Sequence, residues 1–225
     1  MKLSIIIPCY NEALTIKEVL QNVENADIGQ YEKEIIVVDD GSTDNTKEIL
    51  KDNNIPAILV YHDKNYGKGR AIYSGLEKAT GNYVIIQDAD LEYNPIEYKK
   101  LLEKISENIP VIYGMRSYKQ GYIHYRIGAY LVTLTMNILY GTKIHDSYTC
   151  YKLIKTDLFK SLNLQSDGFE IEAEITAKLL NKKINIFEVP IEYHPRKFSD
   201  GKKIRAVDAL KGLFKIFSIW SKYQG

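Results

Sequence analysis

Cysteine and long apolar runs are both scarce in this chain of 225 residues. The two cysteines, Cys9 and Cys150, are too few for a disulfide framework and lack the spacing of metal ligands, so a reduced, cytosolic compartment is expected. The first apolar run stops at Pro8 without a preceding basic region or a following small-residue cleavage site, so secretion is not expected. With 45% hydrophobic and 26% charged residues, the composition is that of a soluble globular protein.

Glycine-rich nucleotide loops are also missing. No Walker A sequence occurs, which argues against a nucleoside triphosphatase. Gly67-Lys68-Gly69-Arg70 holds a G-x-G, but Ile72 stands where a dinucleotide fingerprint has its third glycine, and the motif does not follow the first expected strand. Binding of NAD is therefore disfavoured. Two interpretations of Lys68 remain open, a contact to a nucleotide and a solvated lysine at the start of a helix.

The net charge is only +1, but it is distributed unevenly. Residues 196–225 carry a local charge of +6, which leaves −5 on the other 195 residues. A basic end on an acidic body indicates an anionic partner, either phosphate groups or a membrane surface. Nucleic acid is not expected as a partner, because the basic excess is confined to one end and no nucleic-acid motif accompanies it.

Three apolar runs lead into polar or acidic residues. These are Tyr10-Asn11-Glu12, Asp39-Asp40 and Asp88-Ala89-Asp90, with Glu92 extending the last series. At the carboxyl edge of a parallel sheet, such strand ends share one crevice. Mg²⁺ and Mn²⁺ prefer oxygen ligands and keep phosphate in the same shell, so the acids at 88, 90 and 92 predict a metal-held diphosphate. For Asp88-Ala89-Asp90 alone, the alternative is a loop that caps the helix opened by Pro95.

Short apolar strands alternate with polar-faced helices through the first half of the chain. We expect strands at about 3–8, 34–39, 57–61, 83–87 and 111–114, and helices at about 13–24, 43–53, 69–79 and 95–106. This alternation implies right-handed crossovers and a mostly parallel α/β sheet flanked by helices. No internal repeat or Pro/Gly/Ser-rich linker interrupts the pattern, so a single domain over 1–203 is expected.

The second half is less regular. A strand is expected near 147–154, a helix near 169–181, and a pair of strands near 184–193 with Pro190 between them. Residues 122–140 are apolar and aromatic, but Arg126 interrupts them and the uncharged part, 127–142, is too short to span a bilayer comfortably. This segment is interpreted as a helix packed at a surface or forming a homodimer contact.

The end of the chain, 204–225, predicts an amphipathic helix. From Ile204 to Lys222, one half of the helical wheel collects Val207, Leu210, Leu213, Phe214, Ile216, Phe217 and Trp220, and the other half is mainly basic. A strong apolar face with lysines and a terminal Trp is typical of a helix lying in a membrane interface, which makes peripheral attachment one expectation. The other is a helix docked on the core of its own domain.

The motifs Ile-Ile-Pro-Cys-Tyr-Asn-Glu, Val-Val-Asp-Asp-Gly-Ser-Thr-Asp, Gly-Lys-Gly and Asp-Ala-Asp, in this order, resemble those of family 2 glycosyltransferases with the GT-A fold. Later stretches narrow the resemblance to dolichyl-phosphate mannose synthases and polyprenyl-phosphate glycosyltransferases. They are 146–152, 168–170, 188–193 and 201–204. The resemblance covers about nine-tenths of the chain, and it specifies the fold and reaction class but not the sugar. It implies a nucleotide-sugar half at 1–115 and an acceptor half at 116–203.

The resemblance also implies roles for individual residues. The base and ribose pocket would use Pro8, Tyr10, Glu12, Val38 and Asp40, with Lys68, Asp88 and Ala89 also expected to contact the nucleotide. A divalent metal would be held by Asp88, Asp90 and Glu92, with Asp90 as the most direct ligand. Phosphate-facing and acceptor-side cations would be Arg116, Arg126 and Arg196, together with Lys202 or Lys203. The spacing of Arg196-Lys-Phe-Ser-Asp-Gly-Lys-Lys departs by one residue from the family pattern, so either lysine can be the equivalent one.

The acceptor decides whether a general base is needed. Glu172 and Glu174 are candidates if the acceptor is a hydroxyl, whereas a lipid phosphate is already anionic and needs none. The alternative for at least one of Glu170, Glu172 and Glu174 is a solvated acidic helix face. The predicted activity is metal-dependent, inverting transfer of a sugar from a UDP- or GDP-sugar to a polyprenyl phosphate at the cytoplasmic face of a membrane. Transfer to a glycan or glycolipid hydroxyl, and nucleotide-sugar binding without catalysis, are the rivals.

Overall fold

The computed structural model describes residues 1–52, 54, 56–117, 123–196, 203 and 206–222. Seven strands form one sheet in the order β3-β2-β1-β4-β6-β5-β7. They are β1 Lys2–Cys9, β2 Glu32–Asp39, β3 Ala57–Tyr61, β4 Tyr83–Ile86, β5 Val111–Arg116, β6 Lys152–Lys155 and β7 Phe187–Ile191. Only β6 runs antiparallel to its two neighbours in this sheet of the described chain. The mostly parallel α/β fold predicted from the sequence is thus confirmed.

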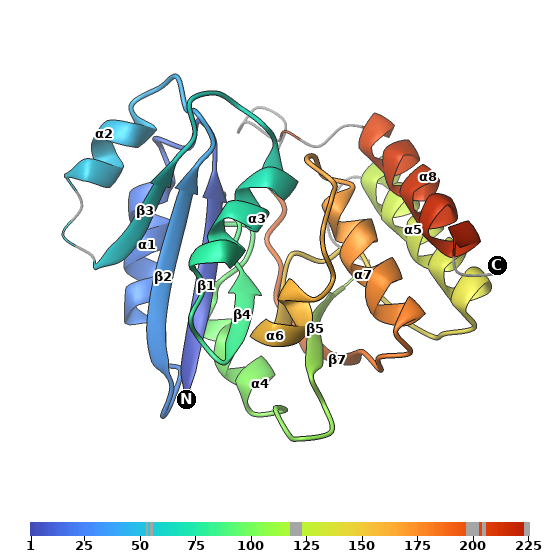
Figure 1. The fold of residues 1–225 in the computed structure, drawn as a ribbon. Helices are drawn as coiled ribbons and strands as arrows, with labels where there is room; N and C mark the ends of the chain where they lie inside the picture. The colour runs from blue at the N-terminus through green and yellow to red at the C-terminus, as the bar shows by residue number, and fades with distance from the viewer. Residues whose placement is uncertain (53, 55, 118–122, 197–202, 204–205, 223–225) are drawn as a thin grey trace.

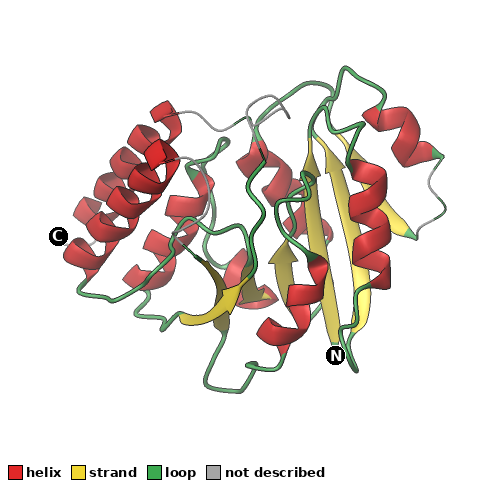
Figure 2. Ribbon diagram, turned by 180° about the vertical axis from the view of Figure 1, so that it is seen from behind, coloured by secondary structure: helices red, strands yellow, loops and turns green. Residues whose placement is uncertain are grey.

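Helices cover both faces of the sheet (Figures 1 and 2). The regular helices of the first half are α1 Ile16–Asn25, α2 Thr46–Lys51 and α3 Lys68–Lys78, followed by the short pair η1 Pro95–Glu97 and α4 Tyr98–Leu102. Those of the second half are α5 Ile123–Tyr140, α6 Thr156–Lys160, α7 Ile171–Asn181 and α8 Ala206–Lys222. The three crossovers that join β1, β2, β3 and β4 place the carboxyl ends of these strands at one edge, as expected for a parallel arrangement.

Several predicted boundaries were wrong. The helix expected at 95–106 is instead a 3₁₀ turn followed by a short helix that ends at Leu102. The Asn94 side chain caps the start of the turn by accepting the N–H of Ile96. The strand expected at 147–154 begins only at Lys152. The expected pair at 184–193 is one strand that contains Pro190, which is tolerated because β7 is the last strand of the sheet and proline there interrupts no central ladder.

The main hydrophobic core lies between the sheet and its covering helices, and a second, smaller core lies between α5, α7 and α8. The second core contains Val132 and Met136 of α5, Ala173 and Ala177 of α7, and Ile216 and Ile219 of α8. Figure 1 shows α5 and α8 side by side at the outer end of the molecule. Both apolar helices predicted from the second half therefore dock on their own domain through one face.

The outward faces of α5 and α8 are apolar as well. On α8, Val207, Leu210, Phe214 and Phe217 are 49%, 66%, 78% and 50% exposed, and on α5 Tyr130 and Ile138 are 54% and 70% exposed. The half-wheel of apolar residues in α8 is therefore divided between a buried and an exposed row. No helix within the described residues has the length and apolarity needed to cross a membrane.

Candidate active site

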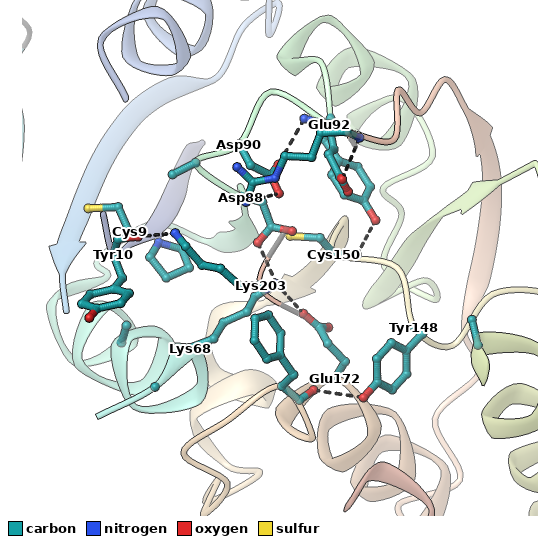
Figure 3. A pocket seen from close by; sticks show the side chains of 18 of the residues that line it. Cys9, Tyr10, Lys68, Asp88, Asp90, Glu92, Tyr148, Cys150, Glu172 and Lys203 are labelled. Carbon is teal, nitrogen blue, oxygen red and sulfur yellow. Dashed lines mark hydrogen bonds and ion pairs between the residues drawn. The ribbon is translucent and has the colours of Figure 1, made fainter. Parts of the chain in front are cut away.

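A cavity of about 550 Å³ opens where the carboxyl ends of β1 and β4 meet the start of β6 (Figure 3). Strand order reverses between β1 and β4, and this is the position at which open α/β sheets bind ligands. Of the residues predicted for the site, thirteen line this cavity: Pro8, Tyr10, Glu12, Asp40, Lys68, Asp88, Ala89, Asp90, Glu92, Arg116, Glu172, Arg196 and Lys203. Most of the residues predicted for the site therefore lie at this cavity, although they make up less than half of its lining.

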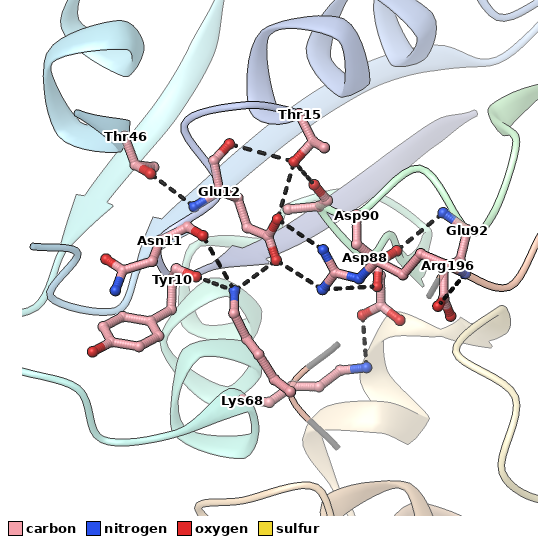
Figure 4. Close-up of polar contacts among 12 residues, drawn as sticks. Tyr10, Asn11, Glu12, Thr15, Thr46, Lys68, Asp88, Asp90, Glu92 and Arg196 are labelled. Carbon is pink, nitrogen blue, oxygen red and sulfur yellow. Dashed lines mark hydrogen bonds and ion pairs between the residues drawn. The ribbon is translucent and has the colours of Figure 1, made fainter. Parts of the chain in front are cut away.

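The turn after β1 is held by the loop after β2 (Figure 4). Asn11 adopts a left-handed conformation with φ of 50°, its backbone N–H donates to Ser42 Oγ, and its side-chain oxygen accepts the N–H of Thr43 at 2.7 Å. The N–H of Glu12 donates to Thr46 Oγ1 at 2.9 Å. The Gly-Ser-Thr-Asp motif thus positions the preceding turn, which leaves the side chain of Glu12 directed to the cavity.

Two cations from the end of the chain reach Glu12. Both terminal nitrogens of Arg196 donate to the Glu12 carboxylate, at 3.1 and 3.2 Å, and one of them lies 3.5 Å from Asp90 Oδ2. Lys203 Nζ lies 2.6 Å from Glu12 Oε1 and donates to the carbonyl oxygen of Tyr10. Two cations of the basic segment predicted from the uneven charge therefore contact the acids that follow β1 and β4. Lys202 lies outside the described residues.

The pKa values of Asp88 and Asp90 shift in opposite directions, although the two residues are only two positions apart. Burial alone would raise the pKa of Asp88, but the Lys68 ammonium, 2.6 Å from its Oδ1, outweighs burial and lowers that pKa below its ordinary value. Burial and the neighbouring carboxylates Asp88 and Glu92 raise the pKa of Asp90 to about 7. Asp90 therefore lies in an incompletely balanced negative environment that favours a bound proton, and a cation could take the place of that proton.

Glu92 does not join Asp88 and Asp90 as the predicted third metal ligand. Leu91 has φ of 62°, so the chain turns after Asp90 and the alternation assumed from the spacing is lost. Glu92 accepts the hydroxyl of Tyr193 at 2.5 Å and the backbone N–H of Arg196 at 2.9 Å. Across the described part of the chain, no three His, Cys, Asp or Glu side chains are grouped as a metal site. Glu92 instead anchors the segment that carries Arg196.

The Gly-Lys-Gly motif serves close packing and brings Lys68 into the cavity. A side chain at Gly67 or Gly69 would collide with the backbone of Asp167 or Ser166, and the N–H of Gly69 donates to the carbonyl of Asp167 at 2.7 Å. Lys68 therefore reaches Glu172 of α7 at 3.0 Å as well as Asp88. The fully buried Lys152 of β6 pairs with the other oxygen of Glu172. These four charges join the two halves of the sheet.

The acidic face predicted for α7 is not solvated. Glu172 and Glu174 are 3% and 1% exposed, and Glu170 is half-buried. Glu174 lies outside the cavity, because it accepts the N–H groups of Gln165 and Ser166 and pairs with Lys178 at 2.6 Å. The structure thus places Glu174 away from the residues predicted to act with it. Its hydrogen bonds connect α7 to the loop that precedes it.

Other predicted residues have structural surroundings of their own. The Arg116 guanidinium lies 2.7 Å from Asp146 Oδ2 and 5.1 Å from the Tyr193 ring centroid, so it lines the cavity while paired. Arg126 of α5 is not among the cavity-lining residues. Val38 is fully buried in β2 opposite Pro8 of β1, so it supports the pocket floor without facing it.

Sequence reasoning missed an aromatic and apolar part of the lining. Tyr93, Tyr148, Cys150 and Phe169 line the cavity, as do Ile127, Leu131 and Val132 of α5. Cys150 and Tyr148 precede the antiparallel β6, so they enter the site from the start of a strand. The rule that ligands collect at the carboxyl ends of strands does not predict these two residues. The buried Lys152 does have a sequence signal, because a lysine within the apolar run at 150–154 is unusual.

The sequence profile described as glycosyl transferase family 2 matches residues 4–162. This chain belongs to glycosyl transferase family 2. The match covers most of β1 and all of the strands from β2 to β6. The family and its transfer activity thus agree with the cavity at the strand ends.

Relatives of this glycosyltransferase include proteins with named activities. It is 30% identical over 222 residues to a dolichol-phosphate mannosyltransferase of Pyrococcus furiosus, covering 94% of this chain and 60% of the relative. It is 31% identical over 204 residues to a low-salt glycan biosynthesis hexosyltransferase of Haloferax volcanii, covering 86% and 48%. An uncharacterised protein of Methanocaldococcus jannaschii is 31% identical over 206 residues, covering 84% and 87%. The chain thus spans about half to two-thirds of the length of these two named relatives.

Solved structures confirm the GT-A fold. Glucosyl-3-phosphoglycerate synthase of Mycobacterium tuberculosis, crystallised with Mn²⁺, UDP and its product, superposes with a TM-score of 0.77 at 18% identity, covering 98% of this chain and 80% of that one. The same enzyme was crystallised with Mg²⁺ and UDP, with a TM-score of 0.77. At this identity the likeness establishes the fold.

Proposed function

We propose that this glycosyltransferase moves a sugar from a UDP- or GDP-sugar to a polyprenyl phosphate, with a divalent metal and with inversion at the sugar. The observation that carries the proposal is one cavity with two kinds of lining. Acids and cations at the carboxyl ends of β1 and β4 line it, and so do apolar side chains of α5. A charged donor and a lipid acceptor can meet there. Relatives named as dolichol-phosphate and undecaprenyl-phosphate transferases support this assignment.

On the donor side, Asp88 and Asp90 would hold Mg²⁺ or Mn²⁺. The all-carboxylate donor set fits a hard cation, and Mg²⁺ commonly uses only one or two protein carboxylates plus phosphate and water, so a third ligand from Glu92 is not required. The bound metal would neutralise charge on the departing diphosphate. Arg196 and Lys203 would contribute positive charge on the same side, and Tyr10 and Asp40 would line the nucleoside pocket.

On the acceptor side, the carboxylates are paired. Glu172 lies between the ammonium groups of Lys68 and Lys152. Asp146 accepts hydrogen bonds from two nitrogens of the Arg116 guanidinium, at 2.7 and 2.9 Å. A carboxylate neutralised in this way is a poor general base. This favours an acceptor that is already anionic, such as a lipid phosphate. A single in-line displacement by that phosphate would invert the anomeric centre.

The apolar end of the cavity leads toward the exposed face of α5. Ile127 and Leu131 line the cavity and are also 52% and 47% exposed. Together with the exposed row of α8 they form an apolar surface, to which Lys211, Lys215 and Lys222 add positive charge. Such a surface fits peripheral binding to an anionic membrane, which we propose to be the cytoplasmic face. A lipid phosphate could then enter from the membrane.

A transfer assay with matched acceptors tests the proposal. Purified protein is mixed with labelled UDP- or GDP-sugars, Mg²⁺ or Mn²⁺, and vesicles that contain either a polyprenyl phosphate or the corresponding polyprenol. Transfer to the phosphate alone, lost in EDTA, is expected, and NMR of the product should show the inverted anomer. Transfer to the polyprenol would identify a hydroxyl acceptor. Binding of donor without transfer to any acceptor would favour a binding protein.

A further inference from the structure

The carboxylate of Glu188, in the last strand β7, holds a single loop. The backbone N–H of His145 donates to both of its oxygens at 2.9 Å, and the backbone N–H of Asp146 donates to Oε1 at 2.9 Å. The ring nitrogen Nδ1 of His145 lies 2.8 Å from Oε2. The Glu188 side chain is only 11% exposed and does not line the cavity. Glu188 therefore fixes the backbone of the loop that carries Asp146.

Asp146 in turn holds Arg116, the last residue of β5. Its Oδ2 accepts Nε of the guanidinium at 2.7 Å and the backbone N–H of Arg116 at 3.2 Å, and its Oδ1 accepts Nη2 at 2.9 Å. Asp146 is only 1% exposed. Two parallel hydrogen bonds to one carboxylate fix the plane of a guanidinium as well as its position. The orientation of Arg116 therefore depends on the orientation of Asp146.

Arg116 lines the cavity while one edge of its guanidinium is not used by the protein. Tyr193 lies over the guanidinium, 5.1 Å from the ring centroid to the central carbon, and Asp146 accepts Nε and Nη2. Among the residues that the structure describes, none accepts a hydrogen bond from the third nitrogen, Nη1. Planar guanidinium donors of this kind suit a phosphate oxygen. A phosphate group at this wall of the cavity would meet donors that are already oriented.

The same loop has a second anchor that does not involve Glu188. The side-chain amide of Asn137 in α5 donates to the carbonyl of Ile144 at 2.8 Å and accepts the N–H of Ile144 at 2.9 Å. The loop should therefore keep its course without Glu188, although the N–H groups of His145 and Asp146 would lose their acceptor. The specific contribution of Glu188 is the orientation of Asp146.

We infer that Glu188 is a positioning residue for the acceptor phosphate, because it fixes through Asp146 the guanidinium of Arg116 that binds this group. The inference rests on the proposed function and gives the edge strand β7 a role in acceptor binding. Glu188 itself does not touch the substrate. Its loss should therefore weaken acceptor binding and leave donor binding and the transfer step intact, which appears as a higher KM at constant kcat.

The first test is the kinetics of Glu188→Met, which keeps the length of the side chain but has no oxygen to accept the N–H groups. The assay contains Mg²⁺, a UDP- or GDP-sugar and vesicles with a polyprenyl phosphate. We expect the KM for polyprenyl phosphate to rise by at least about tenfold, the usual effect of losing hydrogen bonds that hold a charged group. The kcat, and the Kd for UDP or GDP measured by calorimetry, should not change.

Two matched variants serve as controls for this change. Glu188→Gln keeps one oxygen that can accept both backbone N–H groups, so it should restore the KM of the wild type. Glu192→Gln alters an exposed acid of the same segment and should have no effect. A general loosening of the fold would change kcat, donor Kd and acceptor KM together. That result, or an unchanged acceptor KM in Glu188→Met, would overturn the inference.

A measurement without turnover tests the route through Arg116. The Nε–H of Arg116 gives an NMR resonance that is assigned by its loss in Arg116→Lys. In the wild-type chain this proton is held by Asp146 and should exchange slowly with water. Glu188→Met should speed the exchange by at least about tenfold, and Glu188→Gln should not. Unchanged exchange in Glu188→Met would overturn the positioning of Arg116 by Glu188.

Two further outcomes separate this inference from the proposed function. Glu188→Asp has a shorter side chain that draws the oxygens away from the loop, so it should also raise the acceptor KM and serves if Glu188→Met fails to fold. Transfer to polyprenyl phosphate with a KM that no change at Glu188 affects would overturn the inference alone. Absence of transfer to polyprenyl phosphate by the wild-type chain would overturn the proposed function and the inference together.

Discussion

The acids of the two halves of this glycosyltransferase are neutralised in different ways. In the second half, Arg116 pairs with the buried Asp146 and Lys178 pairs with the buried Glu174, so each of these acids has a cation of the same half. At the strand ends of the first half, Glu12 and Asp90 both contact Arg196, which comes from the second half. The raised pKa of Asp90 indicates that the negative charge around it is incompletely balanced. The difference indicates that an added cation would be bound beside Asp90.

Removal of Asp90 should have the largest effect on activity. Asp90→Ala removes the surplus charge proposed to hold the metal, and the loss of transition-state stabilisation should be about 3 kcal/mol or more, roughly a hundredfold in turnover. The measurement is the initial rate of sugar transfer. Asp52→Ala, a change at an exposed acid outside the cavity, is the control and should keep normal activity. Near-normal turnover of Asp90→Ala would remove the metal assignment.

The exposed apolar row of α8 should control membrane binding. Phe214→Glu/Phe217→Glu replaces two half- to mostly exposed rings, each contributing up to about 1.5–3 kcal/mol if fully buried in lipid. We expect a loss of about 2–3 kcal/mol in cosedimentation with anionic vesicles, and unchanged nucleotide binding. Ile96→Glu, an exposed apolar position away from α5 and α8, should have no effect. Unfolding of the double variant would show that this row belongs to the domain core.

Loss of Arg196, the cation that contacts both Glu12 and Asp90, should lower the rate of sugar transfer more than the affinity for nucleotide. Arg196→Ala leaves Glu12 and Asp90 without their common partner, and turnover should fall by about 2 kcal/mol, roughly thirtyfold, with a smaller change in the Kd for nucleotide. The same comparison applied to Lys202→Ala and Lys203→Ala decides which lysine acts with it. Arg70→Ala breaks an exposed ion pair with Asp167 and is the matched control. Equal losses of rate and affinity would place Arg196 in the nucleotide pocket.

The surplus charge should also appear in stability without ligands. The pKa of Asp90 is raised from 3.8 to about 7, so its contribution to stability is full below pH 4 and is lost as the pH rises through 7. Asp90→Asn cannot ionise and should therefore gain stability relative to the wild type between pH 4 and pH 8, by up to about 4 kcal/mol for a shift of roughly three pKa units. Urea unfolding at the two pH values measures this gain, with Asp52→Asn as the control. An equal difference at both pH values would show that Asp90 is not the titrating group.

Most of the site residues in the first half could be predicted from sequence because each directly follows a strand. An apolar run followed by acids identifies a strand end, and parallel order then places Glu12, Asp40 and Asp88 together. The site residues of the second half are brought together by contacts between distant residues, which no local pattern encodes. Glu172 and Glu174 look alike in the sequence, because both are acids near the start of α7. In the structure, Glu174 accepts backbone N–H groups of the loop before α7, whereas Glu172 lines the cavity.

The antiparallel strand β6 has a consequence for the evolution of this enzyme. It pairs with β4 through only two residue pairs, whereas β1 and β2 share eight. Because β6 is antiparallel, it leads away from the cavity, whereas the other strands of the described sheet lead toward it. The short β4–β6 pairing therefore allows loops on one side of it to change length without shifting the strand register on the other side. The segment before β6 could therefore vary in sequence while the Lys68–Glu172 pair keeps α3 and α7 joined across the cavity.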